Sequence, residues 1–183
     1  MRLTEDSHAR IAQTHSIVDI SCPDFTAEQY ATGWIACCKS LNGSLWPRTR
    51  FERDMRGDPM IREDGILFSV LDGVLASTAS VQFGRICPYV GWDYDKSATL
   101  HMVGTREGFS RRGAGLNVCA AAVEYALAHG ANAVYLTTDE FRISAIKIYL
   151  KLGFLPVLYD DEQATRWRAV GKTLAREIAC MIP

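Results

Sequence analysis

Apolar and polar residues follow two different periods along the first third of this chain. Residues 14–20 combine β-branched residues with alternation, which predicts a strand. A helix is expected soon afterwards, because Thr26 and Gln29 have the spacing of a capping box and apolar residues then recur at helical intervals until just before Asn42. A shorter amphipathic helix is expected over about 48–56.

Two apolar runs follow, over 66–71 and 74–83, and only Asp72-Gly73 separates them. An Asp-Gly pair between such runs is the strongest short-range signal for an antiparallel hairpin. The next residues, 84–96, are rich in aromatic side chains and are expected to form a loop.

Strands and helices alternate in the second half of the chain. The expected elements are a strand at 99–104, a helix at 113–128, a strand at 133–138, a helix at 142–152, a strand at 154–158 and a helix at 165–179. This alternation implies right-handed crossovers between parallel strands, while the hairpin contributes an antiparallel pair. We therefore expect one α/β domain over residues 1–183, with a mixed, partly parallel central sheet and helices on both faces.

Composition limits the partners, metals and cellular compartment that we expect for this protein. The formal net charge is -1, from 20 basic and 21 acidic residues, so no overall field attracts nucleic acid or an anionic membrane. The six cysteines form no C-x-x-C pair and lack the Cys/His spacing of zinc sites, which predicts free thiols and no metal. With no long apolar run and no signal-peptide pattern, we expect a cytoplasmic protein that binds neither nucleic acid nor membranes.

A glycine-rich turn, Ser110 to Gly115 (Ser-Arg-Arg-Gly-Ala-Gly), lies between a predicted strand and a predicted helix. Free N–H groups at a helix start attract phosphate, glycines let it approach, and Arg111 and Arg112 would strengthen the attraction. The turn lacks the lysine and hydroxyl of a P-loop, and a Rossmann fingerprint would need glycine at Val118. Two interpretations remain. The turn is a pyrophosphate site of another kind, or it is only a tight turn whose arginines are solvated.

This turn resembles the pyrophosphate loop of the GNAT superfamily of acyl-CoA-dependent N-acetyltransferases. That loop has the pattern R/Q-x-x-G-x-G/A, and this chain has Ser110-x-x-Gly113-x-Gly115. Serine at the first position departs from the pattern, but the backbone amides that the family uses for pyrophosphate are retained.

A second motif of the same family, N-x-x-A-x-x-x-Y-x-x-x-G-F, is matched at Ala145, Tyr149, Gly153 and Phe154, with Arg142 in place of the asparagine. The resemblance implies a GNAT-like fold and acetyl-CoA, or another acyl-CoA, as co-substrate, bound by a core of about 99–158. The residues implied to bind it are Met102, Val103, Gly104, Ser110, Arg111, Arg112, Gly113, Ala114, Gly115, Arg142 and Tyr149.

The resemblance further implies that an amine attacks the acyl-CoA thioester directly in a ternary complex. A lysine-like amine has a pKa of about 10.4, so its neutral form at pH 7 costs about 4.6 kcal/mol without help from the site. Candidates for the base are His101 and Asp139, with Glu107 and Glu140 as further options. His101 could equally be a structural strand residue, and Asp139 or Glu140 could cap the next helix.

By similarity to the family, a backbone N–H near Val103 or Gly104 stabilises the thioester oxygen as its charge develops. Tyr149 is implied to share a proton with the leaving thiolate, although a buried helix aromatic explains the residue as well. Full transfer is uphill by about 2 kcal/mol, because a thiol pKa near 8.5 lies about 1.5 units below that of a phenol.

We expect the acceptor to be a small amine, with Trp46, Trp92 and Tyr94 as candidates to line its pocket. One alternative is a non-catalytic acyl-CoA sensor or regulatory module of the same fold, suggested by Ser110 and Arg142. Another is an interaction domain without a cofactor. The sequence leaves the acyl length, the identity of the base and the oligomeric state open, with a homodimer among the options.

Overall fold

The computed structural model of this chain describes residues 1–42, 46–84 and 96–181. Its strands are β1 (Arg2–Thr4), β2 (Ser16–Asp19), β3 (Ile61–Leu71), β4 (Val74–Phe83), β5 (Ser97–Thr105) and β6 (Ala133–Tyr135). Its helices are α1 (Ala27–Asn42), α2 (Arg48–Phe51), α3 (Ala114–Ala128), α4 (Ile143–Leu152) and α5 (Asp161–Leu174), with a short 3-10 helix η1 (Glu5–Ser7) and a π-helical turn η2 (Glu52–Arg56). None of the helices in these described ranges combines the length and the apolar character needed to cross a bilayer.

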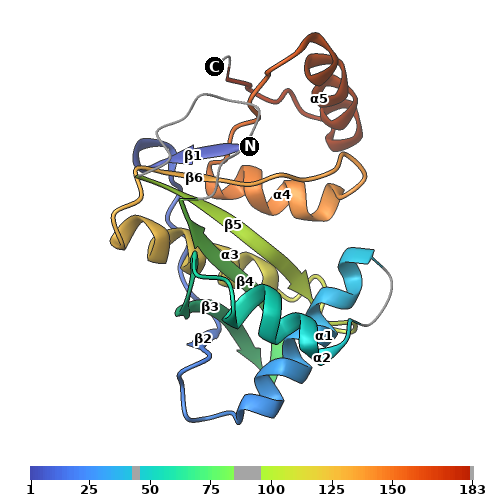
Figure 1. The fold of residues 1–183 in the computed structure, drawn as a ribbon. Helices are drawn as coiled ribbons and strands as arrows, with labels where there is room; N and C mark the ends of the chain where they lie inside the picture. The colour runs from blue at the N-terminus through green and yellow to red at the C-terminus, as the bar shows by residue number, and fades with distance from the viewer. Residues whose placement is uncertain (43–45, 85–95, 182–183) are drawn as a thin grey trace.

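The strands form one sheet in the order β1-β6-β5-β4-β3-β2 (Figure 1). Strands β5 and β6 run parallel, joined by a crossover through α3, and all other neighbours are antiparallel. The expected α/β fold with a mixed sheet is confirmed, and its parallel part in the described residues is this single pair.

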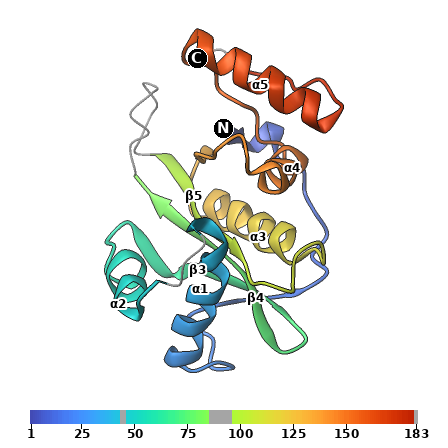
Figure 2. The ribbon, with the colours of Figure 1, turned by 90° about the vertical axis from the view of Figure 1, so that its right-hand side faces the viewer.

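Successive residues of β3 pack on opposite faces of the sheet. Leu67 belongs to a core cluster with Val118 of α3 and Leu152 of α4, whereas Ile66 and Phe68 pack against the helices α1 and α2. This alternation follows from the two-residue period of a strand. Figure 2 shows α1 and α2 on one side of the sheet and α3 and α4 on the other, so helices cover both faces as expected.

Two predictions from local sequence are confirmed in detail. The Thr26 N–H donates to Gln29 Oε1 at 2.7 Å and the Gln29 N–H donates to Thr26 Oγ1 at 3.2 Å, which is a reciprocal capping box. Asp72 and Gly73 both have positive φ, 53° and 71°, as a two-residue hairpin turn between β3 and β4 requires.

The strand expected at 154–158 is wrong. This segment makes isolated bridges from Leu155 to Arg2 and from Val157 to Met181, because β1 already pairs with the available edge of β6. Phe154 is nevertheless fully buried, so its apolar character reflects packing and not a strand ladder.

Several other boundaries differ from the expectation. Strand β6 ends at Tyr135, three residues before the expected limit, and the last helix begins earlier, where the Asp160 carboxylate accepts the Gln163 N–H at 2.8 Å. The segment 48–56 divides into α2 and η2. The expected loop at 84–96, with Trp92 and Tyr94, lies almost wholly outside the described residues.

Candidate active site

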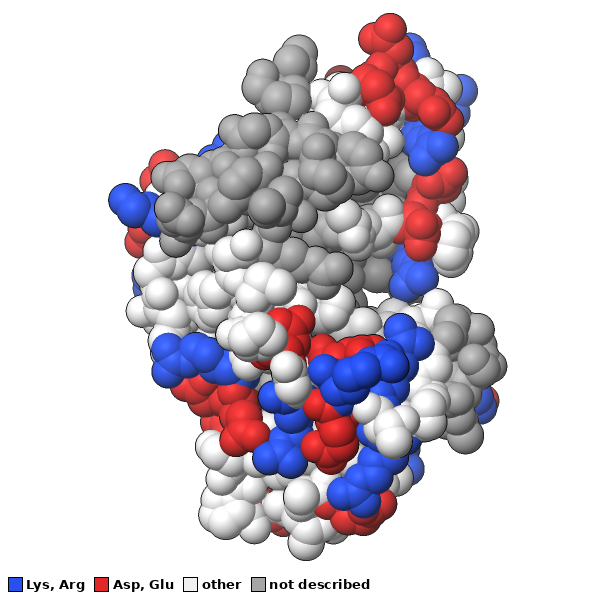
Figure 3. Space-filling view, in the orientation of Figure 1, with Lys and Arg blue, Asp and Glu red and all other residues white. Residues whose placement is uncertain are grey.

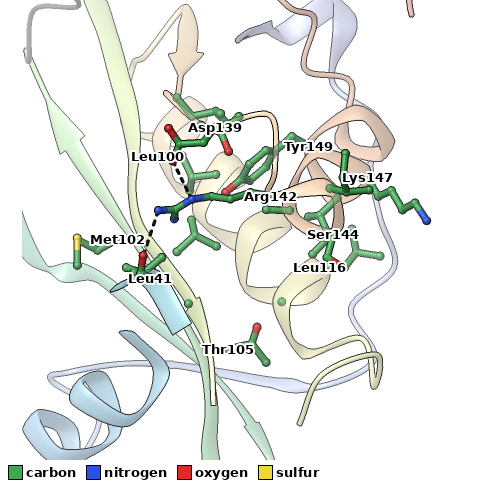
Figure 4. A pocket seen from close by; sticks show the side chains of 18 of the residues that line it. Leu41, Leu100, Met102, Thr105, Leu116, Asp139, Arg142, Ser144, Lys147 and Tyr149 are labelled. Atoms are coloured by element: carbon green, nitrogen blue, oxygen red, sulfur yellow. Dashed lines mark hydrogen bonds and ion pairs between the residues drawn. The ribbon is translucent and has the colours of Figure 1, made fainter. Parts of the chain in front are cut away.

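The parallel strands β5 and β6 separate after a short stretch of pairing. Residues Ser97–Thr99 pair with Ala133–Tyr135, after which β5 continues to Thr105 while the other strand ends. A cavity of about 1190 Å³ opens at this separation, between β5, the start of α3 and the face of α4 (Figure 4). An opening between separated parallel strands exposes main-chain groups that a continuous sheet would have paired.

A β-bulge interrupts β5 on the cavity wall. Ser80 pairs with His101 and Thr78 pairs with Gly104, so Met102 and Val103 together oppose one residue of β4. Met102 has a φ of 51°, the left-handed conformation that such an irregularity imposes. Because a bulged residue is left out of the ladder, the bulge can present a main-chain N–H to a ligand.

Gly104 has a structural reason to be glycine. A Cβ atom there would lie 2.5 Å from the carbonyl oxygen of Cys37 and 3.2 Å from the nitrogen of Cys38, both in α1. Helix α1 can therefore pack this closely on β5 only because residue 104 has no side chain. Gly104 also lines the cavity, so the two roles coexist.

The start of α3 forms the opposite end of the cavity wall. Gly113 is the N-cap with a φ of 86°, and the Asn117 N–H donates to its carbonyl at 3.0 Å as the first helical hydrogen bond. The N–H groups of Ala114 and Gly115 precede that bond and, with the helix dipole, attract anions. Ser110, Arg111, Gly113, Ala114 and Gly115 all line the cavity.

Arg112 points elsewhere. Its Nη2 lies 2.7 Å from Asp72 Oδ2 in the hairpin turn, and its guanidinium lies over the Phe109 ring. Arg112 is not among the residues that line the cavity. Of the two arginines expected at the phosphate end, Arg111 alone faces the cavity.

His15 is a site neighbour that sequence reasoning missed. A Cβ atom on Gly113 would lie 3.1 Å from His15 Cε1, so the imidazole lies beside the start of α3. Thr14 Oγ1 contacts His15 Nδ1 at 2.9 Å, and the buried Asn117 accepts the Thr14 N–H at 2.7 Å. Asn117 thus anchors the segment before β2 to α3, a contact across 103 residues that no local pattern indicates.

Arg142 crosses the cavity from α4 to α1. Its Nη2 donates to the carbonyl oxygen of Leu41 at 3.1 Å, and its Nε lies 3.0 Å from Asp139 Oδ2 (Figure 4). Arg142 and Asp139 are therefore brought together, as two of the expected site residues.

Tyr149 lies on the inner face of α4 and is 6% exposed. Its ring packs edge-on against Phe154, with centroids 5.9 Å apart, and among the described residues its hydroxyl has no hydrogen-bond partner. Burial raises the pKa of Tyr149, the nearby Cys119 thiol adds to this, and the Arg142 guanidinium opposes it. The hydroxyl therefore stays protonated at neutral pH and can donate a hydrogen bond into the cavity.

The candidate bases differ in their surroundings. His101 lines the cavity from β5, and Asp139 lines it while ion-paired to Arg142. Glu107 and Glu140 are not among the residues that line this cavity. Glu107 is 84% exposed and pairs with Lys39, and Glu140 lies 4.0 Å from Arg166. Trp46 lines the cavity, and its expected place in the acceptor pocket stays a prediction.

The profile of the acetyltransferase (GNAT) family matches residues 25–154, well over half of the chain. The fold and the cavity thus define an acyltransferase class, and the chain belongs to the GNAT acetyltransferase family. A search of curated proteins found no match.

Solved structures share this fold at low sequence identity. The aminoglycoside acetyltransferase AAC(6')-Iy, solved with the bisubstrate analog CoA-S-monomethyl-acetylneamine, is 14% identical with a TM-score of 0.59 over 78% of this chain and 91% of its own. A transcriptional regulator from Bacillus halodurans C-125 is 19% identical, with a TM-score of 0.56 over 76% and 92%. A GCN5-related N-acetyltransferase from Kribbella flavida is 20% identical, with a TM-score of 0.53 over 85% and 52%.

Proposed function

We propose that this protein transfers an acyl group, with acetyl as the first choice, from acyl-CoA to the amine of a small molecule by direct attack in a ternary complex. One observation carries the proposal. One cavity joins the open N-terminus of α3 to the bulge of β5 and to the Tyr149 hydroxyl, which has no hydrogen-bond partner in the part of the chain that the structure describes. Phosphate groups and a thioester lie at opposite ends of acyl-CoA, and the cavity has chemistry suited to each end.

The start of α3 binds the pyrophosphate in this proposal. The N–H groups of Ala114 and Gly115 and the Arg111 side chain supply positive potential. Gly115 is closely packed, because a Cβ there would lie 3.1 Å from Thr105 Oγ1 and 3.3 Å from Ile148 Cδ1. His15 adds a nearby imidazole donor to the same end.

The bulge of β5 and Tyr149 act at the thioester. A main-chain N–H at Val103 or Gly104 stabilises the oxygen that gains charge during attack. The Tyr149 hydroxyl donates a hydrogen bond to the sulfur as the bond to the acyl carbon breaks. Burial raises the pKa of Tyr149, so the phenol gives up its proton less readily. We therefore expect the hydrogen bond, and not complete proton transfer, to stabilise the leaving thiolate.

His101 is the base that this account favours. Asp139 also lines the cavity, but its carboxylate is ion-paired to Arg142, so we assign it to holding that arginine. His101 lies next to the bulge, where an amine approaching the thioester would lose its proton directly or through water.

A small acceptor agrees with the surface charges on the face drawn in Figure 3, where basic and acidic side chains are interleaved. Around α2, for example, Arg50 pairs with Asp54 and Arg56 pairs with Glu63. Among the described residues of that face, such pairing leaves no continuous basic stripe for a long polyanion. Trp46 supplies an apolar wall beside the cavity.

The test is an initial-rate study of thiol release from acetyl-CoA with a panel of small primary amines. Intersecting reciprocal plots for the best amine would support direct attack in a ternary complex, whereas parallel plots would indicate an acyl-enzyme intermediate. No amine-dependent thiol release over the whole panel would contradict the transferase proposal.

A second candidate is an acyl-CoA sensor without turnover. The hydrogen bond from Arg142 to Leu41, which connects α4 and α1 across the cavity, favours it, as does serine at position 110. Saturable binding of acetyl-CoA without thiol release to any amine is the outcome that this alternative predicts.

A further inference from the structure

Arg142 lies at the thioester end of the cavity. Figure 4 shows its guanidinium beside Leu41, Leu100 and Asp139, whereas Thr105 lies toward the opposite end. That opposite end is the phosphate end, because Thr105 contacts the start of α3 through Gly115. A positive charge at the thioester end is not needed to bind pyrophosphate.

Within residues 1–42, 46–84 and 96–181, the guanidinium of Arg142 has more N–H donors than it has hydrogen-bond acceptors. Among the described residues, its one hydrogen bond goes from Nη2 to the Leu41 carbonyl. Nε is shielded from solvent and has no hydrogen-bond acceptor, because Asp139 Oδ2, although 3.0 Å away, lies off the N–H direction. A guanidinium presents several N–H donors in one plane, and the Arg142 side chain is 32% exposed, so an acceptor that enters the cavity can reach its outer N–H groups.

The surroundings select a planar anion as that acceptor. The Leu41 carbonyl holds one edge of the guanidinium, and Asp139, whose side chain is 55% exposed, can move into solvent when another anion arrives. A carboxylate matches the guanidinium fork with two parallel hydrogen bonds, which a lysine could not provide. Leu100 and Met102 supply an apolar environment that strengthens such a pair.

We propose that Arg142 binds a substrate carboxylate at the thioester end of the cavity, an inference that rests on the acyltransferase function proposed above. The carboxylate has two sources: an amino-acid-like acceptor, or the far end of a dicarboxylic acyl group. In either case Arg142 determines specificity, and Asp139 holds its guanidinium in place until the substrate binds.

Matched substrate pairs test this inference in the full chain. In the acceptor arm, each α-amino acid is compared with its carboxamide, with acetyl-CoA as donor. In the acyl arm, succinyl-CoA is compared with butyryl-CoA, which has the same carbon chain without the carboxylate. We expect kcat/KM in one arm to favour the carboxylate by roughly 10- to 100-fold, the range of a charge-assisted hydrogen bond.

Variants of Arg142 distinguish recognition of a carboxylate from a purely structural link between α4 and α1. R142Q should remove most of the preference, because kcat/KM should fall roughly 10- to 100-fold further for the carboxylate substrate than for its uncharged partner, and R142K should restore only part of it. K151Q is the matched control, because Lys151 lies exposed on the same helix outside the cavity lining; it should leave the preference unchanged. Equal losses for both members of a pair in R142Q would overturn the inference and leave Arg142 a structural link.

A binding measurement keeps the inference independent of turnover. Titration calorimetry compares succinyl-CoA with butyryl-CoA, and amino acid with carboxamide in the presence of CoA, for wild type and R142Q. A wild type without preference in either arm, by rate or by affinity, overturns the carboxylate inference alone. A wild type that releases no thiol but still prefers a carboxylate ligand contradicts the transferase proposal and supports the role of Arg142.

Discussion

Replacing Tyr149 by phenylalanine removes one oxygen atom from the cavity wall and keeps the packing of the ring. The ring remains edge-on to Phe154 at 5.9 Å, and no protein group among the described residues loses a hydrogen bond. We therefore expect Y149F to unfold at the same temperature as wild type and to bind acetyl-CoA with the same affinity.

The expected loss is in the rate of acyl transfer. A hydrogen bond to a charged acceptor contributes about 1.5–3 kcal/mol, which corresponds to roughly 10- to 100-fold in kcat. A larger loss is not expected, because complete proton transfer from a phenol to a thiolate is already uphill by about 2 kcal/mol, and burial raises the pKa of Tyr149 further. Tyr149 is thus expected to act as a hydrogen-bond donor.

The assay is thiol release with saturating acetyl-CoA and amine, with calorimetric binding of acetyl-CoA measured on the same preparations. Tyr125→Phe is the control, because Tyr125 donates to Asp64 at 2.6 Å outside the cavity lining. That variant should lose about 1.5–3 kcal/mol of unfolding free energy, since its acceptor is also a charged group, and keep its kcat. A Y149F enzyme with unchanged kcat would refute the role assigned to the hydroxyl.

Three further predictions concern other parts of the chain. Gly104→Ala should lower the unfolding free energy by about 1–3 kcal/mol in denaturant titrations, because its Cβ meets Cys37 at 2.5 Å, and a neutral result would contradict that packing. His15→Gln should raise KM for acetyl-CoA roughly 3- to 10-fold, as for one modest hydrogen bond, but not KM for acetyl-pantetheine, which lacks the phosphates; equal effects would remove His15 from the phosphate end. Burial lowers the pKa of His8 from its ordinary 6.5, with Glu124 opposing and Arg10 assisting. The unfolded chain therefore takes up this proton first, so as pH falls through 6.5 the folded state should lose stability relative to His8→Gln, and parallel stability profiles for the two proteins would contradict the assignment.

Local signals in the sequence predicted the elements whose geometry depends on neighbouring residues. The capping box at Thr26 and the turn at Asp72-Gly73 are of this kind, because a few adjacent side chains and backbone angles determine them. The order of strands and helices around the cavity followed from the same local patterns.

Long-range contacts explain what the sequence did not predict. Strand β1 is three residues long and forms because it pairs with β6 across more than a hundred residues, which displaces the expected strand at 154–158. The charge of Arg112 suggested a phosphate contact, but its guanidinium forms an ion pair with Asp72 in the hairpin turn. The link from Arg142 to Leu41 likewise depends on the packing of α4 opposite α1, which no spacing along the chain indicates.

Titration calorimetry with acetyl-CoA, CoA and acetyl-pantetheine tests the central claim most directly. If the start of α3 binds the pyrophosphate, acetyl-CoA and CoA should both bind saturably in the micromolar range, acetyl-pantetheine should bind far more weakly, and Arg111→Glu should weaken the first two ligands alone. No binding of acetyl-CoA at millimolar concentration would contradict the proposed cofactor site and leave only the family and the fold.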